Sequence, residues 1–292
     1  MKKVVVMHLL VVLLLASTWG LAVAAEVLVI YDTFEVGPIS PDRWIGASFG
    51  PDLFSPNGNL YEQNRSIIVD PSGVGRDLRV LNRWYSLTNS YVGIALGVYG
   101  LEFKNPGPVT AIRARMQVLS AVSKACLTNP SPTIAQARLM GFFFNVVPAT
   151  NGLTDAVLAQ VAVQRRSNSA DPANVFEVVG SVLQCLDFDC VNANPLGLPL
   201  GTVLLGKVTV GQWVKVLVQW DEANDQFIFQ RDNQAQKFVS YAGVTDTDPT
   251  AVPIKGLGVT NLVPNCTSTP RPFASMNVLV DNVAVNTSAL PQ

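Results

Sequence analysis

Apolar and polar side chains alternate along several short segments of this chain. In the segment 112–118, the even positions are apolar, whereas the odd positions carry two arginines and a glutamine. The segments 160–164 and 213–220 alternate in the same way. The polar side chains of these three segments are Arg113, Arg115, Gln117, Gln160, Gln164, Lys215 and Gln219. A period of two residues predicts β-strands with one buried face and one polar face.

About a dozen segments rich in Val, Ile, Phe and Tyr have the length and composition of strands. They are the segments 26–34, 76–85, 91–98, 109–119, 139–147, 157–166, 175–183, 203–208, 213–220, 226–231, 238–241 and 273–285. Clusters of Pro, Gly and Asn separate them, and few stretches show a helical period. The pattern predicts an all-β antiparallel sandwich or barrel, in one domain over about 26–292.

The N-terminal segment carries the three parts of a secretory signal peptide. Lys2 and Lys3 are followed by the apolar run 4–15, and the segment 22–25 is Ala-Val-Ala-Ala. We expect residues 1–25 to be a cleaved signal peptide of a bacterial protein. An uncleaved N-terminal anchor is the alternative, although the apolar run is short for a membrane span. The expected location is therefore secreted or periplasmic, with no membrane span after signal removal.

Composition excludes several classes of function. The formal net charge is -1, so the chain lacks the excess of positive charge that is typical of nucleic-acid-binding proteins. Charged residues make up 14% of the chain, against about 25% in ordinary soluble domains. The single histidine, His8, lies in the expected signal peptide. The mature chain then has no imidazole, which excludes Ser-His-Asp and Cys-His catalysis.

The four cysteines are expected to form disulfides, because an exported chain meets an oxidising compartment. Four cysteines allow three pairings. The short spacing between Cys185 and Cys190 favours their pairing, which leaves Cys126 and Cys266 as a long-range pair. A thiol redox role is not indicated, because the spacing differs from C-x-x-C.

Short motifs at both ends of the chain resemble the concanavalin A-like lectin/glucanase superfamily, particularly its laminin-G-like bacterial members. The segments 31–35 and 39–44 are similar to the first strand and the following x-S-P-x-x-W segment of such domains. The segments 218–229 and 278–285 are similar to a late hairpin and the final D-N-V strand. The resemblance implies a two-sheet jelly-roll sandwich and a function in carbohydrate binding or cleavage.

The catalytic members of this superfamily use an E-x-D-x-x-E cluster on one strand, and no such motif occurs here. The segment 140–145 is most similar to the catalytic strand but contains no acid. The nearest acid cluster, Asp221, Glu222 and Asp225, is interpreted as a hairpin turn with its bend at 224–225. The sequence therefore leans away from an enzyme.

One cofactor is implied by the resemblance, a structural calcium ion. The first and last strands are neighbours in the resembled fold, and several members hold calcium there. In this chain the corresponding residues are Asp32 and Asp281. Asp187 and Asp189, between two cysteines, are interpreted as a solvated loop instead, because a calcium site normally needs six or more oxygens.

The favoured hypothesis is an exported, non-catalytic module that binds a polysaccharide or cell-surface glycan on one polar sheet face. Guanidinium and amide groups hydrogen-bond sugar hydroxyls, and aromatic rings stack on sugar faces. The expected ligand-binding residues are Arg113, Arg115, Gln117, Gln160, Gln164, Lys215 and Gln219, with rings from Trp84, Tyr85, Tyr91 and Trp213. An ordinary solvated face is the plainer alternative. A glycoside hydrolase or polysaccharide lyase, and a structural or adhesion protein, remain as alternative functions.

Overall fold

The computed structural model describes most of the chain beyond the expected signal peptide. The described residues are 27–48, 52–54, 61–87, 93–147, 152–190, 192–197 and 201–290. The predicted signal peptide and Tyr91 lie outside these ranges. Within the ranges, no helix combines the length and the apolar character that crossing a bilayer requires.

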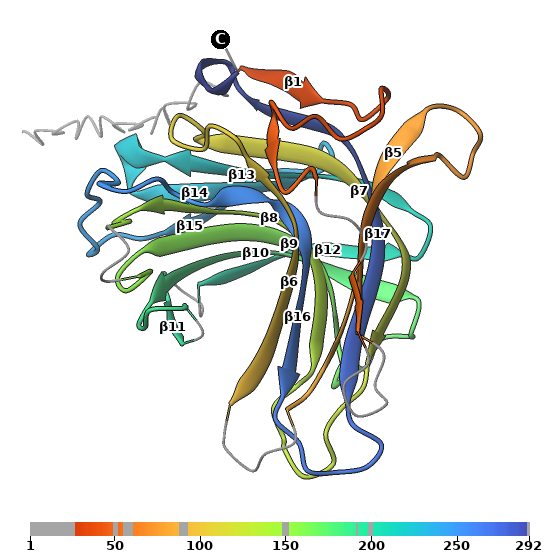
Figure 1. Ribbon diagram of the computed structural model, residues 1–292. Helices are drawn as coiled ribbons and strands as arrows, with labels where there is room; N and C mark the ends of the chain where they lie inside the picture. The colour runs from red at the N-terminus through yellow and green to blue at the C-terminus, as the bar shows by residue number, and fades with distance from the viewer. Residues whose placement is uncertain are drawn as a thin grey trace, which may run out of the picture.

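Antiparallel strands form two sheets, which Figure 1 shows stacked against each other. In the described ranges, sheet A has nine strands. Eight follow the order β15 (Lys237–Ser240), β14 (Gln226–Arg231), β13 (Trp213–Asp221), β7 (Ala111–Ser123), β17 (Phe273–Asn286), β5 (Arg76–Tyr85), β4 (Tyr61–Val69) and β3 (Asp52–Phe54), and the ninth, β1 (Leu28–Asp32), also pairs with β17. Sheet B has eight strands among the residues that the structure describes. Seven follow the order β11 (Ala193–Pro195), β10 (Val175–Cys185), β9 (Val157–Arg166), β8 (Ile134–Phe144), β16 (Lys255–Pro264), β6 (Ile94–Phe103) and β2 (Trp44–Ile45), and the eighth, β12 (Thr202–Thr209), also pairs with β10. The predicted antiparallel sandwich is confirmed.

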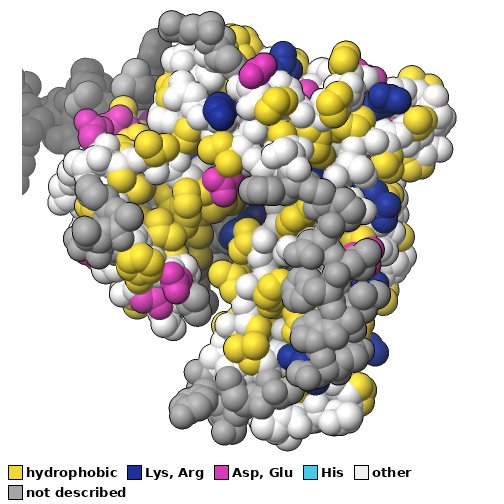
Figure 2. Space-filling view, in the orientation of Figure 1, with side chains coloured by type: hydrophobic (Ala, Val, Ile, Leu, Met, Phe, Trp, Pro, Cys, Tyr) yellow, Lys and Arg dark blue, Asp and Glu magenta, His cyan; other side chains and the backbone are white. Residues whose placement is uncertain are grey.

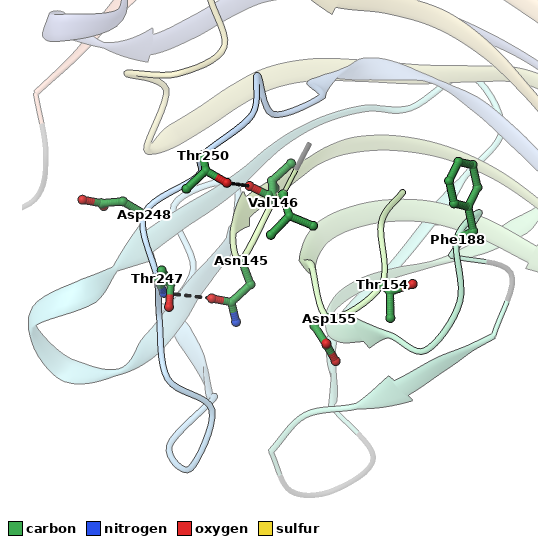
Figure 3. A pocket seen from close by; sticks show the side chains of 9 residues that line it. Asn145, Val146, Thr154, Asp155, Phe188, Thr247, Asp248 and Thr250 are labelled. Carbon is green, nitrogen blue, oxygen red and sulfur yellow. Dashed lines mark hydrogen bonds between the residues drawn. The ribbon is translucent and has the colours of Figure 1, made fainter. Parts of the chain in front are cut away.

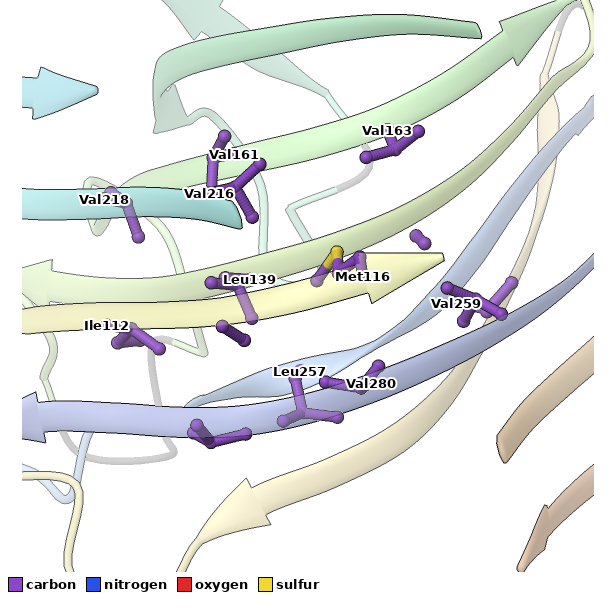
Figure 4. Packing of buried hydrophobic residues seen from close by; sticks show 14 of the residues in the cluster. Ile112, Met116, Leu139, Val161, Val163, Val216, Val218, Leu257, Val259 and Val280 are labelled. Atoms are coloured by element: carbon purple, nitrogen blue, oxygen red, sulfur yellow. The ribbon is translucent and has the colours of Figure 1, made fainter. Parts of the chain in front are cut away.

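The core lies between the two sheets and consists of the apolar positions of the alternating strands (Figure 4). Met116 from β7 and Val216 from β13 pack into the same cluster as Leu139, Val161 and Leu257 from sheet B. All five side chains are buried. The alternation read from the sequence in β7, β9 and β13 therefore assigns the inward and outward positions correctly.

The two ends of the domain meet in sheet A, as the resemblance implied. β1 pairs antiparallel with β17, and Asp32 lies opposite Val283. The β13–β14 hairpin also agrees with the sequence. A 3-10 turn, η2 (Glu222–Asn224), joins its strands, and Asp225 has a left-handed φ of 49°. The Asn224 amide donates to both carboxylate oxygens of Asp221, at 3.0 and 2.9 Å, so this acid cluster stabilises a turn.

Both predicted disulfides are present. Cys126 pairs with Cys266 across 140 residues, and Cys185 pairs with Cys190 across 5. The first bond links the segment after β7 to the segment after β16, and thus joins loops of the two sheets. The second closes a small loop at the end of β10. Two disulfides indicate an oxidising environment.

Sheet B is strongly curved, and glycines on β6 and β16 accompany the curvature (Figure 1). Gly100 and Gly258 lie opposite each other in the register of the two strands. A Cβ atom on Gly258 would collide with the carbonyl oxygen of Tyr99, so only glycine fits there. The outer face of sheet B is therefore concave.

Candidate functional site

The outer face of sheet B forms an open groove of about 940 Å³. Strands β6, β16, β8, β9 and β10 supply most of its lining, and the loop closed by Cys185 and Cys190 supplies part of one wall. Figure 2 shows the molecule hollowed here, with hydrophobic side chains exposed in the hollow. We call this feature the sheet B groove.

Aliphatic side chains form much of the groove wall. Leu96 and Val98 on β6 are 36% and 54% exposed and line the groove. Leu262 on β16 lies opposite Leu96 in the register. Met140 and Leu158 line the part formed by β8 and β9. The wall therefore offers apolar contact area to a ligand.

A hydrogen-bonded row of polar side chains crosses the floor of the groove. Arg138 on β8 donates from Nη1 to Oε1 of Gln160 on β9, at 2.7 Å. The Gln160 amide donates in turn to Oγ of Ser181 on β10, at 3.2 Å. Four residues further along β9, the Gln164 amide donates to Oε2 of Glu177 on β10, at 3.2 Å. Three adjacent strands thus place an ordered polar strip between apolar walls.

Two further polar side chains on the floor have unused hydrogen-bonding capacity. Gln136 lies two residues before Arg138 on the same face of β8 and opposite Thr260 of β16. In the described part of the chain, the Gln136 amide makes no side-chain hydrogen bond. The Thr260 hydroxyl is buried without a partner. Such groups are costly unless a ligand or water satisfies them.

Carboxylates are sparse in the groove. Of the described residues that line it, only Glu102 on β6 and Asp189 in the disulfide loop carry one, and Glu177, the partner of Gln164, is not among the lining residues. Burial raises the pKa of Glu102, and the charge of Arg65 opposes that rise. The Arg65 guanidinium donates to the carbonyl of Gly100 and lies 4.6 Å from the centroid of the Tyr99 ring. Because β16, β8 and β9 separate β6 from β10, the two acids belong to opposite walls.

The residues predicted to bind ligand divide between two faces of the sandwich. Those on the outer face of sheet A are Arg113, Arg115 and Gln117 on β7, and Trp213, Lys215 and Gln219 on β13. Gln160 and Gln164 on β9 line the sheet B groove instead. The apolar sides of β7 and β9 pack into one core, so their polar sides point away from each other. The expectation of a single polar face was therefore wrong.

On sheet A the predicted side chains mainly contact each other and their own loops. Arg115 forms an ion pair of 3.3 Å with Asp281 and lies 4.7 Å from the centroid of the Trp213 ring. Lys215 donates from Nζ to Oδ1 of Asn233, at 3.0 Å. None of these residues lines the groove. Ligand binding on this face stays a prediction, and the contacts themselves are those of an ordinary sheet surface.

Trp84 and Tyr85 are half-buried, their rings pack against other aromatic rings, and ligand binding by them stays a prediction. Trp84 packs against the core, and its ring centroid is 5.1 Å from that of Tyr61. Trp84 lies an even number of residues from the buried Leu78 and Val80 on β5, so its side chain points to the same inner face. The Tyr85 ring packs against that of Phe273, at 5.1 Å.

The two aspartates expected to bind calcium have other partners. Asp32 accepts hydrogen bonds from the Phe34 amide, at 2.9 Å, and from the Trp44 indole, at 2.7 Å, so both of its oxygens are used. Asp281 pairs with Arg115. Across the described ranges, no group of three or more His, Cys, Asp or Glu is arranged to hold a metal. Both carboxylates thus have protein partners, and calcium binding by Asp32 and Asp281 stays a prediction.

A smaller pocket of about 560 Å³ lies at the end of sheet B, beside the disulfide loop (Figure 3). Asn145 joins two of its segments, because its Oδ1 accepts the Thr247 amide at 2.8 Å and its Nδ2 donates to the Thr245 carbonyl at 2.9 Å. Asp155 is exposed, and so is the ring of Phe188, which is 56% accessible. The side chain of Asn145 is thus committed to holding the loops, and the larger sheet B groove is the stronger candidate.

Arg138, Gln136, Thr260 and Glu102 were not predicted as site residues. The segment 135–139 alternates apolar and polar positions as β7 does, which is a signal that could have revealed Gln136 and Arg138. The predicted strand began at Leu139 and therefore excluded both. Thr260 lies on β16, which the sequence did not predict at all. Thr260 reaches the groove floor only because β16 pairs with β8, and the sequence does not reveal this pairing.

No family model matches the chain, and no curated protein matches it. Similar solved structures include LamAcat from Zobellia galactanivorans, with 11% identity, a TM-score of 0.41, and coverage of 89% of this chain and 97% of that chain. A laminarinase from a Flavobacterium species has 14% identity, a TM-score of 0.42, and coverage of 89% and 100%. Lectin II from Ulex europaeus has 11% identity, a TM-score of 0.27, and coverage of 78% and 95%. Laminarinases and lectins agree with the resemblance read from the sequence, but likeness at this level carries no argument about activity.

Proposed function

We propose that this protein is an exported, non-catalytic module that binds polysaccharides in the sheet B groove. The observation that carries the proposal is the polar strip of Arg138, Gln160 and Ser181 between exposed aliphatic walls. Sugars present hydroxyl groups around the ring edge and C–H groups on the ring faces. Amide and guanidinium groups suit the former, and aliphatic side chains suit the latter.

The scarcity of acids supports binding over cleavage. Glycosidases need two carboxyl groups, about 5–5.5 Å apart for retention or about 6.5–9.5 Å apart for inversion. In the described lining, the two acids stand on opposite walls, with three strands between their parent strands. Neighbouring strands lie about 4.8 Å apart, so the backbones that carry these acids are separated by several strand spacings. The groove thus resembles a binding surface more than a hydrolytic centre.

The compartment proposed for the protein is outside the cytoplasm. The two disulfides support an oxidising environment. The segment 1–25 has the composition of a signal peptide, which supports export by the same route as other secreted proteins. A polysaccharide ligand is consistent with this location.

The test compares groove and control variants against a panel of soluble polysaccharides. Gln136→Ala combined with Gln160→Ala removes two amides from the groove floor, and the control Gln230→Ala removes one from β14, outside the groove. Affinity gel electrophoresis should show at least about tenfold weaker binding for the groove variant and no change for the control. Equal losses in both, or no retardation by any polysaccharide, would refute the proposal.

The enzyme alternative is tested in the same preparation by release of reducing sugars. The binding module should release none above background. Sustained turnover that Glu102→Gln abolishes would instead identify Glu102 as a catalytic acid, and the non-catalytic proposal would be wrong.

A further inference from the structure

Arg138 is a positive charge in the groove with no acidic partner. Its one hydrogen bond within the described part of the chain is to the neutral amide of Gln160, at 2.7 Å. None of the ion pairs found in that part includes Arg138. The nearby acid Glu102 is influenced by Arg65. A guanidinium group has five N–H donors, so most of the donor capacity of Arg138 is unused.

Small residues flank Arg138 on both neighbouring strands, and its side chain is half-buried. In the register of sheet B, Arg138 lies between Gly258 of β16 and Ala162 of β9. Both neighbours are too small to cover the guanidinium from the side. Gln136, two residues away on the same strand, and Thr260 opposite it add polar groups with unused hydrogen-bonding capacity. At this point of the groove, a ligand therefore meets the Arg138 cation beside neutral hydrogen-bonding groups.

The surroundings make this cation energetically unfavourable in the free protein. Burial lowers the pKa of Arg138 to about 10, so the group is still charged at neutral pH. A partly desolvated charge that lacks an opposite charge lowers stability, and such groups concentrate at functional sites. An anion bound beside it would supply the missing partner through charge-assisted hydrogen bonds.

We propose that the sheet B groove is specific for acidic polysaccharides and that Arg138 binds a carboxylate or sulfate group of the sugar chain. The inference rests on the proposed function and specifies its ligand class. Arg166 lies on the same face of β9, four residues beyond Ala162 and about 13 Å along the strand. Its Nε is buried without a partner, so a second anionic group of an extended chain has a cation to meet. The formal net charge of the chain is -1, so overall charge does not attract polyanions.

The experiment measures affinity for matched acidic and neutral polymers. The probes are polygalacturonate, the same polymer after reduction of its carboxyl groups, dextran sulfate and unmodified dextran. The protein should bind at least one acidic probe about tenfold or more tightly than its neutral counterpart, and this affinity should fall with added salt. Whether polygalacturonate or dextran sulfate binds more tightly distinguishes carboxylate from sulfate recognition.

Variants then assign the preference to Arg138. Arg138→Gln should lose about tenfold or more in affinity for the acidic probe, whereas its affinity for the neutral probe should change little. Arg138→Lys keeps the charge without the planar fork and should lie between the two. Arg76→Gln, at an exposed arginine of β5 outside the groove, is the matched control and should bind like the unaltered protein.

The melting temperature separates a ligand-binding role from a structural one. Removing an uncompensated cation should leave the thermal midpoint of Arg138→Gln unchanged or higher, whereas a structural arginine would lower it. If Arg138→Gln keeps full affinity for the acidic probes, or if neutral and acidic probes bind equally, the acidic specificity is refuted while the polysaccharide module stands. If neither kind of probe binds, the proposed function fails as well.

Discussion

Lys255, at the start of β16, supports a prediction about stability that does not involve the groove. The residue is 1% exposed, and its ammonium group donates to the carbonyl of Val109 at 2.6 Å and reaches that of Gly107 at 3.5 Å. The Phe143 ring centroid lies 4.7 Å from Nζ. Throughout the described ranges, no carboxylate forms an ion pair with it. Burial lowers its pKa from 10.5 to about 7.

This depressed pKa makes the free energy of unfolding depend on pH. Between about pH 7 and 10.5 the unfolded chain holds the proton and the folded chain releases it. Unfolding then takes up a proton, so the free energy of unfolding increases as the pH rises through this window. One pKa unit corresponds to about 1.4 kcal/mol, so the whole shift amounts to about 4–5 kcal/mol. At and below about pH 7, the buried charge of Lys255 lowers the free energy of unfolding by this whole amount.

Replacing Lys255 by methionine keeps an unbranched apolar stem and removes the ammonium group. The variant escapes the cost of the buried charge but leaves carbonyl groups without a donor, which costs about 1–3 kcal/mol. At pH 7 we expect the variant to be more stable by about 2 kcal/mol. This advantage should shrink with rising pH and reverse near pH 9, because the neutral amine of the unaltered protein still donates hydrogen bonds.

The assay is guanidinium denaturation followed by circular dichroism at several pH values from 6.5 to about 9.5. Lys104→Met, at an exposed lysine, is the control, and its curve should run parallel to that of the unaltered protein. Parallel pH dependences for Lys255→Met and the unaltered protein would show that Lys255 does not titrate in this window, and the reasoning would be wrong.

Two further predictions concern stability. Burial, a hydrogen bond with Asp70 and the charges of Asp70 and Asp281 raise the pKa of Asp77 to about 7. The folded chain then holds a proton that the unfolded chain loses above about pH 4, so stability should fall between about pH 4 and 7. Asp77→Asn should flatten this part of a plot of melting temperature against pH, and an unchanged slope would contradict the assignment. Replacing both Cys126 and Cys266 by serine should cost about 5 kcal/mol on chain entropy alone, against about 2 kcal/mol for Cys185 and Cys190, because the loop closed is 140 rather than 5 residues long. Equal losses in denaturation midpoints for the two double variants would contradict the loop-length argument.

Local patterns were sufficient for the strands whose faces differ in polarity. β5, β9 and β14 have the predicted bounds, because an apolar inner face and a polar outer face produce a clear period of two. β16 was missed because Gly256 and Gly258 occupy outward positions, where polar side chains would have produced a recognisable period of two residues. β4 was missed because most of its residues before Ile67 are polar. Both strands form through pairing with neighbours distant in the chain, which short windows do not contain.

The sequence by itself determined the strand-rich class, the two disulfides, the turn at 224–225 and the inward or outward direction of side chains on β7, β9 and β13. These features depend on contacts along one segment or on the chemistry of single residues. Only the tertiary structure decided that the polar faces of β7 and β9 point in opposite directions, and that Arg138 stands beside Gln160 in a curved groove. Strand parity is local, but the sheet that a strand joins, its neighbours and its curvature depend on pairings between distant segments.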